Sequence, residues 1–210
     1  MNSGSLIVLN GGSSAGKTSI GEALQDLFDE PYLLLGIDAF YRALPLRQKD
    51  HSRVDPQYYS VETMVEGGLE YFRLAPGPIL DRITFGRYRA IARLLELGLN
   101  VIADEVLWKR EWLFDAARVF EPYRAFLAGV FVSDEEAERR HAARGRQGMG
   151  MGWYRGSSRY AHADAIYDLT IDTTNDTSLA CAEKIKTALA NGLEPTAFAR
   201  VRGSFSGEGQ

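Results

Sequence analysis

The stretch from Leu9 to Ser19, LNGGSSAGKTS, places four glycine or alanine positions, four hydroxyl side chains and one lysine at the end of an apolar run. From Gly11 to Thr18 its spacing is G-x-x-x-x-G-K-[ST], the pattern of loops whose backbone N–H groups surround phosphates. The alternative is an ordinary turn between a strand and a helix. If the pattern holds, the residues that contact the phosphates of a nucleotide are Gly11, Gly12, Ser13, Ser14, Ala15, Gly16, Lys17, Thr18 and Ser19.

The segments on either side of this loop supply the context that the pattern requires. Residues 5–9 are apolar and partly β-branched, and the glycines end them after too few residues for a helix, so they predict a buried strand. After the loop, apolar residues recur at helical spacing from a start near Lys17, namely at Ile20, Ala23, Leu24 and Leu27. Strand, glycine loop and helix therefore follow in the required order.

Strands and helices alternate along the rest of the chain. Strands are predicted at 32–37, 99–104, 124–132 and 167–174, and helices at 79–97, at 112–120, from 133 to about 144, and at 179–190. Right-handed crossovers between such units give a mostly parallel sheet of about five strands with helices on both faces. The sequence therefore predicts an α/β three-layer sandwich with the P-loop NTPase fold of nucleotide and shikimate kinases.

Three segments fall outside this alternation, within what we expect to be one domain over residues 1–192. Residues 44–78 predict an irregular insertion on the substrate side, in which the part after residue 60 fits either a hairpin turning at Gly67-Gly68 or short helical pieces. Residues 145–159 are glycine-rich and basic and predict a mobile loop, within an arginine-bearing lid over about 139–160. Residues 193–210 lack periodicity and predict a disordered tail.

The bulk properties of the 210 residues narrow the choice of partners. A net charge of −4 and a pI near 5.5 provide no basic field for nucleic acid or an anionic membrane. No apolar stretch is long enough to cross a membrane, no targeting segment is evident, and the single Cys181 suits the reducing cytoplasm. His51, His141 and His162 have no metal-ligand spacing with one another or with Cys181, so we expect no zinc site. A homo-oligomer is compatible with the sequence, but no feature indicates one.

The predicted loop suggests ATP and Mg²⁺ as cofactors. Lys17 would neutralise the β- and γ-phosphate oxygens, and the hydroxyl of Thr18 would bind a Mg²⁺ ion that bridges the same phosphates. Asp104 ends the strand at 99–104 and would hold that ion through water or bond to Thr18. The alternative for Asp104 and its neighbour Glu105 is a solvated acidic strand end.

Asp38 directly follows the strand at 32–37, at the edge where open α/β sheets bind ligands. A carboxylate there would accept or orient the proton of an alcohol that attacks the γ-phosphate. Asp is also favoured at helix N-caps, and the two roles can coexist. The phosphoryl acceptor would then be a small molecule that carries a hydroxyl group.

Arginine and aromatic residues gather at two further places. On a mobile lid, arginines would close over ATP and stabilise charge on the transferring phosphoryl group, whereas at the end of a helix they also simply complement the helix dipole. The candidates are Arg139, Arg140, Arg144 and Arg146. Aromatic residues near the proposed acceptor side would either line an apolar pocket or belong to the core. They are Phe40, Tyr41, Trp108 and Trp112.

Several of these stretches together resemble the chloramphenicol phosphotransferase family. They are the loop at 9–17, GID at 36–38, ALPL at 43–46, AERRHAARG at 137–145 and YDLTIDTT at 167–174. The resemblance covers about two thirds of the chain and leaves out residues 47–98. A second departure is Glu105, because an Asp is expected there.

The resemblance implies an activity and a set of residues. In that family, ATP phosphorylates a hydroxyl of an antibiotic. By the same matching, Asp38 is the general base, Lys17 and Thr18 bind nucleotide and Mg²⁺, and Arg140 and Arg144 are lid arginines.

Three functions fit the sequence. The leading hypothesis is an ATP-dependent O-phosphotransferase that uses Asp38, Lys17, Arg140 and Arg144, with chloramphenicol or a related alcohol as acceptor. A metabolic kinase for a nucleoside, a sugar acid or a shikimate-like alcohol would instead have a polar, arginine-lined acceptor pocket. A nucleotide-binding regulatory module would have a large exposed apolar patch and no acceptor cavity.

Overall fold

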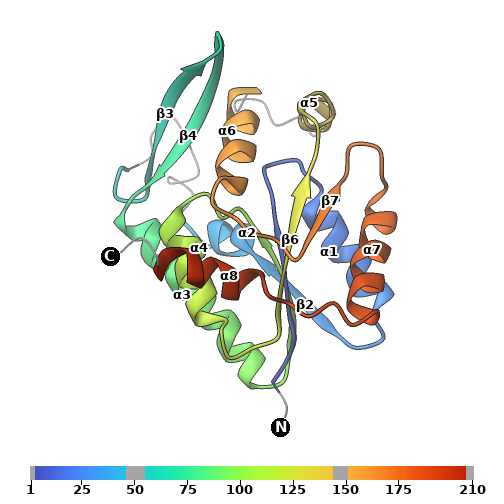
Figure 1. Ribbon diagram of the computed structural model, residues 1–210. Coiled ribbons are helices and arrows are strands. Elements are labelled where there is room, and N and C mark those ends of the chain that lie inside the picture. Colours follow the sequence, from blue (N-terminus) through green and yellow to red (C-terminus); the bar gives the residue numbers. More distant parts are fainter. Residues whose placement is uncertain (1–2, 46–54, 144–150, 207–210) are drawn as a thin grey trace.

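A five-stranded parallel sheet forms the centre of the computed structural model, which describes residues 3–45, 55–143 and 151–206 (Figure 1). Its strands lie in the order β2-β5-β1-β6-β7, and every neighbouring pair is parallel. Their bounds are β1 (Leu6–Asn10), β2 (Tyr32–Gly36), β5 (Asn100–Glu105), β6 (Ala125–Phe131) and β7 (Leu169–Asp172). The predicted α/β fold with a parallel five-stranded sheet is confirmed.

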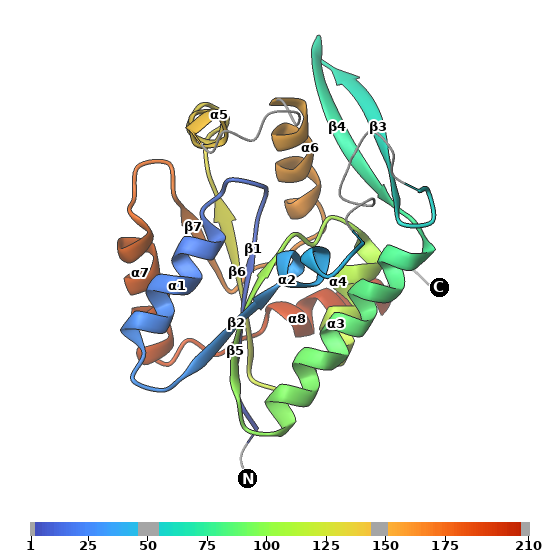
Figure 2. The same ribbon diagram turned by 180° about the vertical axis from the view of Figure 1, so that it is seen from behind.

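Helices cover both faces of this sheet, as Figures 1 and 2 show from opposite sides. The helices are α1 (Lys17–Leu27), α2 (Ile37–Arg42), α3 (Pro78–Glu96), α4 (Arg110–Val119), α5 (Asp134–Ala143), α6 (Met151–His162), α7 (Ser178–Ala190) and α8 (Ala197–Ser206). Because side chains alternate along a strand, Leu6 and Val8 of β1 pack with α3, α4 and α8, whereas Ile7 and Leu9 pack with α1 and α7. A central strand buried on both faces must be apolar throughout, which explains the uninterrupted apolar run before the glycine loop.

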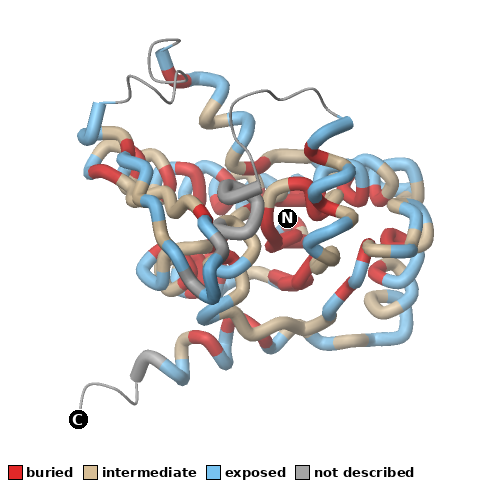
Figure 3. Tube along the Cα trace, turned by 90° about the horizontal axis from the view of Figure 1, so that it is seen from above, coloured by how far each residue is buried: buried red, intermediate tan, exposed pale blue. Residues whose placement is uncertain are grey.

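The carboxyl ends of the strands meet at one edge of the sheet. Leu9 of β1 lies opposite Asp104 of β5, and Gly36 of β2 lies opposite the same residue. The loops that follow β1, β2 and β5 therefore leave the sheet side by side. Seen from above, buried residues lie mainly in the middle of the molecule, with exposed segments around them (Figure 3).

The insertion between α2 and α3 contains a β-hairpin, formed by β3 (Tyr59–Glu66) and β4 (Leu69–Pro76). Glu66 pairs with Leu69, so Gly67 and Gly68 form a two-residue turn, and both have positive φ, at 58° and 76°. Such turns match the twist of paired strands and favour glycine, which selects the hairpin over short helical pieces. Residues 46–54 of the insertion lie outside the described residues.

Two predictions about irregular segments are wrong. The predicted mobile loop at 145–159 is helical from Met151 onward, where α6 packs against β4, and residues 145–150 lie outside the described residues. The supposed disordered tail contains α8, whose Ala197, Phe198 and Val201 are buried in the core with α4. In both segments tertiary packing outweighs weak helix propensity. None of the helices in the described ranges is both long and apolar enough to cross a lipid bilayer.

Candidate functional site

The glycine loop connects β1 to α1 and bends sharply. Gly16 caps α1 in the left-handed region, with φ of 89°, where a side chain would be strained. Ser14 also has positive φ, at 64°, which is uncommon for a residue other than glycine. Its hydroxyl is buried and has no hydrogen-bond partner among the described residues. A strained loop with an unsatisfied buried hydroxyl, ahead of a helix N-terminus, is suited to receive an anion.

Lys17, Thr18 and Asp104 lie together at the start of α1. The ammonium of Lys17 donates to the carbonyl oxygen of Gly12 at 2.9 Å and is 3.6 Å from Asp104 Oδ1. The hydroxyl of Thr18 donates to Asp104 Oδ2 at 2.5 Å. Lys17 and Asp104 are 7% and 16% exposed, so both charges lie in a partly dry environment. The direct contact between Thr18 and Asp104 arises because β1 and β5 are neighbours and both end at this edge.

Glu105 does not face this group of residues. Its carboxylate accepts two hydrogen bonds from Arg87 of α3, from Nε at 2.9 Å and from Nη2 at 2.5 Å. Both side chains are almost completely buried, at 0% for Arg87 and 2% for Glu105. The sequence suggested no partner for Glu105, because Arg87 is one of many cations on an otherwise ordinary amphipathic helix.

Asp38 lies at the same edge of the sheet, in the first turn of α2 rather than at the end of β2. The N-cap of α2 is Gly36, with no capping hydrogen bond from a side chain, so the N-cap interpretation of Asp38 is wrong. A Cβ at Gly36 would come within 2.9 Å of Asp104 Cβ, so the backbone that leads to Asp38 runs directly against Asp104. Asp38 itself is exposed, whereas Asp104 is held by Thr18 and Lys17.

Arg140 of α5 contacts the glycine loop and the end of β7. Its Nη1 donates to the Thr173 hydroxyl at 3.0 Å, its Nη2 donates to the Thr173 carbonyl at 2.5 Å, and its Nε donates to Glu136 at 2.7 Å. Arg139 also pairs with Glu136 but is 70% exposed. These two guanidinium groups lower the pKa of Glu136 to about 2, with Arg139 the larger cause. Arg144 and Arg146 lie outside the described residues.

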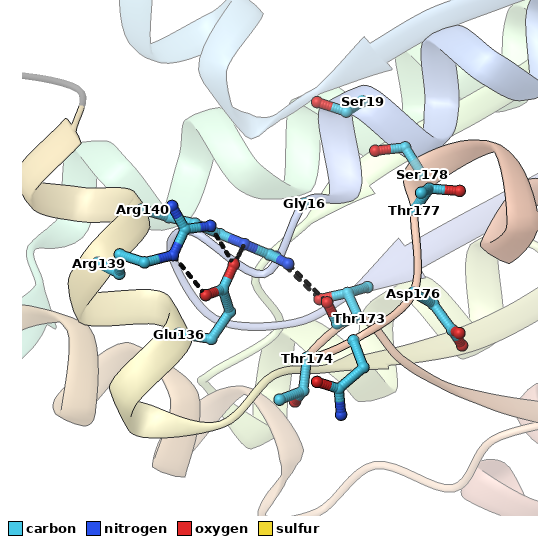
Figure 4. Close-up of a pocket in the computed structure, with 11 residues that line it drawn as sticks. Gly16, Ser19, Glu136, Arg139, Arg140, Thr173, Thr174, Asp176, Thr177 and Ser178 are labelled. Carbon is cyan, nitrogen blue, oxygen red and sulfur yellow. Dashed lines mark hydrogen bonds and ion pairs between the residues drawn. The ribbon is translucent and has the colours of Figure 1, made fainter.

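A cavity of about 450 Å³ opens beside this arginine pair. Figure 4 shows Arg139 and Arg140 on one side of it and Thr177 and Ser178 on the other, with the loop at Gly16 between them (Figure 4). The cavity is bounded by Gly16, Ser19, Glu136, Arg139, Arg140 and the segment 173–178. Thr173, which sequence reasoning missed, joins Arg140 to the glycine loop, because its hydroxyl accepts from Arg140 and donates to the carbonyl of Ala15 at 2.9 Å.

Helix α6 covers the glycine loop from the remaining side. The Ser157 hydroxyl accepts a hydrogen bond from the backbone N–H of Ser13 at 2.9 Å. The buried Asn10 side chain donates to the Ala161 carbonyl at 2.6 Å and to the Tyr167 hydroxyl at 2.8 Å. Asn10 and Ser157 were also missed, because their partners lie more than a hundred residues away and no local pattern marks them.

The four aromatic residues that the sequence singled out are buried to different extents. Trp112 is completely buried, and its indole N–H donates to Asp81 at 2.7 Å, so it belongs to the core. The Trp108 ring lies 4.9 Å from that of Trp112 at a tilted angle of 55°. Trp108 and Tyr41 are partly buried and pack against the core, and Phe40 is also partly buried. No three or more of the His, Cys, Asp and Glu side chains in the described ranges gather in a group able to hold a metal ion.

Comparison with known proteins places this chain in a family. The model of the "Chloramphenicol phosphotransferase-like protein" family matches residues 4–190. Two proteins from strains CDC 1551 and H37Rv of Mycobacterium tuberculosis, each named "Putative O-phosphotransferase", are 51% identical over 206 residues, which is 98% of this chain and 91% of each relative.

Solved structures of kinases share the fold at low sequence identity. The APS kinase CysC of Mycobacterium tuberculosis, in complex with AMPPNP and APS, has a TM-score of 0.58 at 13% identity, covering 90% of this chain and 99% of that one. Shikimate kinase from Acinetobacter baumannii, in complex with shikimate, has a TM-score of 0.53 at 16% identity, covering 90% and 96%. The chain is thus a kinase-like phosphotransferase that belongs to the chloramphenicol phosphotransferase-like family.

Proposed function

We propose that the protein transfers the γ-phosphoryl group of ATP to a hydroxyl of a small molecule, with Asp38 as the general base. The observation that carries this proposal is the pair of carboxylates at one sheet edge. Asp104 is bound to Thr18 and lies near Lys17 of the glycine loop, whereas Asp38, on the adjoining chain segment, is exposed and free to meet an incoming alcohol. One carboxylate suits the nucleotide side, and the other suits the acceptor side.

The nucleotide would place its phosphates on residues 11–19 and its base in the cavity beside Gly16. The loop fits phosphate for two reasons. Gly16 is the N-cap of α1 and has no side chain, and the buried Ser14 hydroxyl has no hydrogen-bond partner among the described residues. Lys17 would exchange its bond to the Gly12 carbonyl for the β- and γ-oxygens. Arg140, already fixed by Glu136 and Thr173, would place its positive charge near the phosphates without a large ordering cost.

The donor set at Thr18 and Asp104 fits Mg²⁺. One hydroxyl and one carboxylate are hard oxygen ligands, and Mg²⁺ in such sites completes its coordination with water and substrate phosphates. The ion would supply charge neutralisation on the β- and γ-phosphates. Asp38 would take the proton of the acceptor hydroxyl as its oxygen bonds to the γ-phosphorus, while the bond from that phosphorus to the β–γ bridging oxygen breaks and ADP leaves.

The family match supports an acceptor such as chloramphenicol or a related alcohol. Arg144 enters this proposal through the family resemblance, as a second lid arginine. Phe40 and Tyr41, which follow Asp38 in α2 and are partly buried, support an acceptor with apolar surface.

Titration with an ATP analogue in Mg²⁺ buffer tests the nucleotide half of the proposal. Removing the buried charge in Lys17→Ala should cost about 1.5–3 kcal/mol of binding free energy, which is roughly ten- to hundredfold in Kd. Lys186→Ala is the matched control, because this lysine donates to the Leu27 carbonyl at the far end of α1. Equal affinities for both variants would contradict phosphate binding by this loop.

Product mass after incubation with ATP tests the acceptor half. Hydroxylated antibiotics, nucleosides and sugar acids should be compared, and we expect a phosphorylated product from an uncharged, amphiphilic alcohol. Products from sugar acids or nucleosides alone would show a metabolic kinase. Tight ATP binding without any acceptor-dependent turnover would favour a regulatory module.

A further inference from the structure

The buried ion pair between Arg87 and Glu105 takes no direct part in the mechanism above. Both charges are buried at the interface of α3 and β5, where the Arg87 side chain is 0% exposed and the Glu105 side chain is 2% exposed. A pair of this kind adds little to stability, because desolvation of the charges offsets their attraction, and apolar residues of similar volume often serve as well. Its geometry, in contrast, is specific, since two parallel N–H groups meet two oxygens at 2.9 and 2.5 Å.

Glu105 is connected to the proposed nucleotide site through the backbone on both sides. The residue before it is Asp104, whose carboxylate binds the Thr18 hydroxyl. Its own carbonyl oxygen accepts the N–H of Gly11, the first residue of the glycine loop, at 3.3 Å. A guanidinium that holds the Glu105 side chain in one orientation therefore fixes the end of β5 at the point where it meets the loop.

Arg87 comes from a helix that begins directly after the hairpin insertion. The side chain of Arg87 extends from α3 to Glu105 of β5. The nearby Arg89 instead pairs with Asp115 of α4 at the surface. Of these two ion pairs of α3, only that of Arg87 reaches a strand that bears a proposed ligand.

We propose that Arg87 and Glu105 are positioning residues, which hold the Asp104 carboxylate and the start of the glycine loop in the geometry that binds the Mg²⁺–nucleotide complex. This inference rests on the proposed function. Partners that orient metal ligands from behind typically change metal affinity 10–100-fold when they are replaced.

The double variant Arg87→Met/Glu105→Leu tests the proposal, because it removes both charges while keeping the volume filled. The measurement is the ratio of ATP-analogue Kd values in EDTA and in saturating Mg²⁺, together with Tm. We expect Tm close to that of the unmodified protein and a Mg²⁺ enhancement that falls roughly 10–100-fold. The matched control is Arg89→Met/Asp115→Leu, which removes an ion pair of α3 that does not reach the sheet and should leave the ratio unchanged.

Each outcome is decisive. An unchanged ratio in a folded Arg87→Met/Glu105→Leu protein would overturn the positioning role and leave the pair a purely structural one. If that variant does not fold, Arg87→Leu/Glu105→Met, which also removes both charges but distributes the side-chain volume differently, is measured in the same way with the same criterion. If Mg²⁺ does not enhance binding of the analogue to the unmodified protein, the proposed function itself fails. The control variant Arg89→Met/Asp115→Leu would then lack the enhancement as well.

Discussion

At the scale of single residues, the site depends on charges that are held in place before any ligand arrives. Asp104 is oriented by Thr18 and lies near Lys17, and Arg140 is fixed by Thr173 and Glu136. Groups already in position need little reorganisation when charge develops on a phosphoryl group. Asp38 is the exception, because it is exposed, and this exposure suits the acceptor-side role that we propose for it.

His162 gives the fold a pH dependence at this scale. Burial, and secondly the charge of Lys17, lower the pKa of His162 from its ordinary 6.5 to about 4. The unfolded chain binds the proton below pH 6.5 and the folded chain resists it, so stability is complete above 6.5 and falls as the pH drops toward 4. Urea unfolding at pH 7 and pH 5 should show a smaller loss for His162→Gln than for the unmodified protein. Equal losses would mean that His162 titrates alike in both states.

The sequence could predict the residues whose positions at the site follow from local spacing. Lys17 and Thr18 follow from the glycine pattern, and Asp104 follows from the end of a strand that pairs with β1. Arg87, Asn10 and Ser157 could not be predicted, because each acts through a partner chosen by tertiary packing. Their bonds to Glu105, Ala161 and Ser13 span 18 to 151 residues of sequence.

At the scale of elements, α6 and the β3–β4 hairpin form a cap beyond the carboxyl ends of the strands, visible at the top of Figures 1 and 2. Arg73 of β4 lies 5.5 Å from the Tyr160 ring of α6, and Arg159 of α6 lies 5.1 Å from the Tyr71 ring of β4. These reciprocal contacts hold the C-terminal part of α6 against β4.

Removing one aromatic partner should loosen this cap without disturbing the sheet. Tyr160→Ala loses the contacts to Arg73 and Tyr71, and we expect amide hydrogen exchange in β3, β4 and α6 to accelerate at least about fivefold, corresponding to roughly 1 kcal/mol. Tyr32→Ala is the control, because that ring stacks on Phe28 away from the cap. Unchanged protection of the hairpin in Tyr160→Ala would show that the cap does not depend on these contacts.

At the scale of the whole molecule, α8 completes one side of the hydrophobic core. α8 packs on α4, and Arg202 donates to the Ala117 carbonyl at 2.6 Å. The alternation of strands and helices was sufficient to predict the sheet and most of the helices. It was not sufficient for α8, because its buried residues Ala197, Phe198 and Val201 are too few to produce a clear periodicity.

The contribution of α8 can be measured by truncating one side chain. Phe198 is 4% exposed and packs against Phe120 at 6.0 Å. Phe198→Ala should lower the free energy of unfolding by about 3–5 kcal/mol through lost burial and the cavity left behind. Leu179→Ala, at a position 51% exposed, should change it by no more than about 0.5 kcal/mol. Similar values for the two variants would contradict a core role for α8.

The central proposal is that Asp38 acts on the acceptor while the glycine loop and Asp104 bind the nucleotide. The most direct test is phosphoryl transfer by the Asp38→Ala variant, measured as the amount of phosphorylated product with ATP and an accepted alcohol at saturating concentrations. Because Asp38 lies outside the glycine loop, we predict that turnover falls about 10²–10⁴-fold while the Kd for ATP stays within about twofold of the unmodified protein. Turnover that survives the substitution, or ATP affinity that is lost along with turnover, would contradict a base at this position.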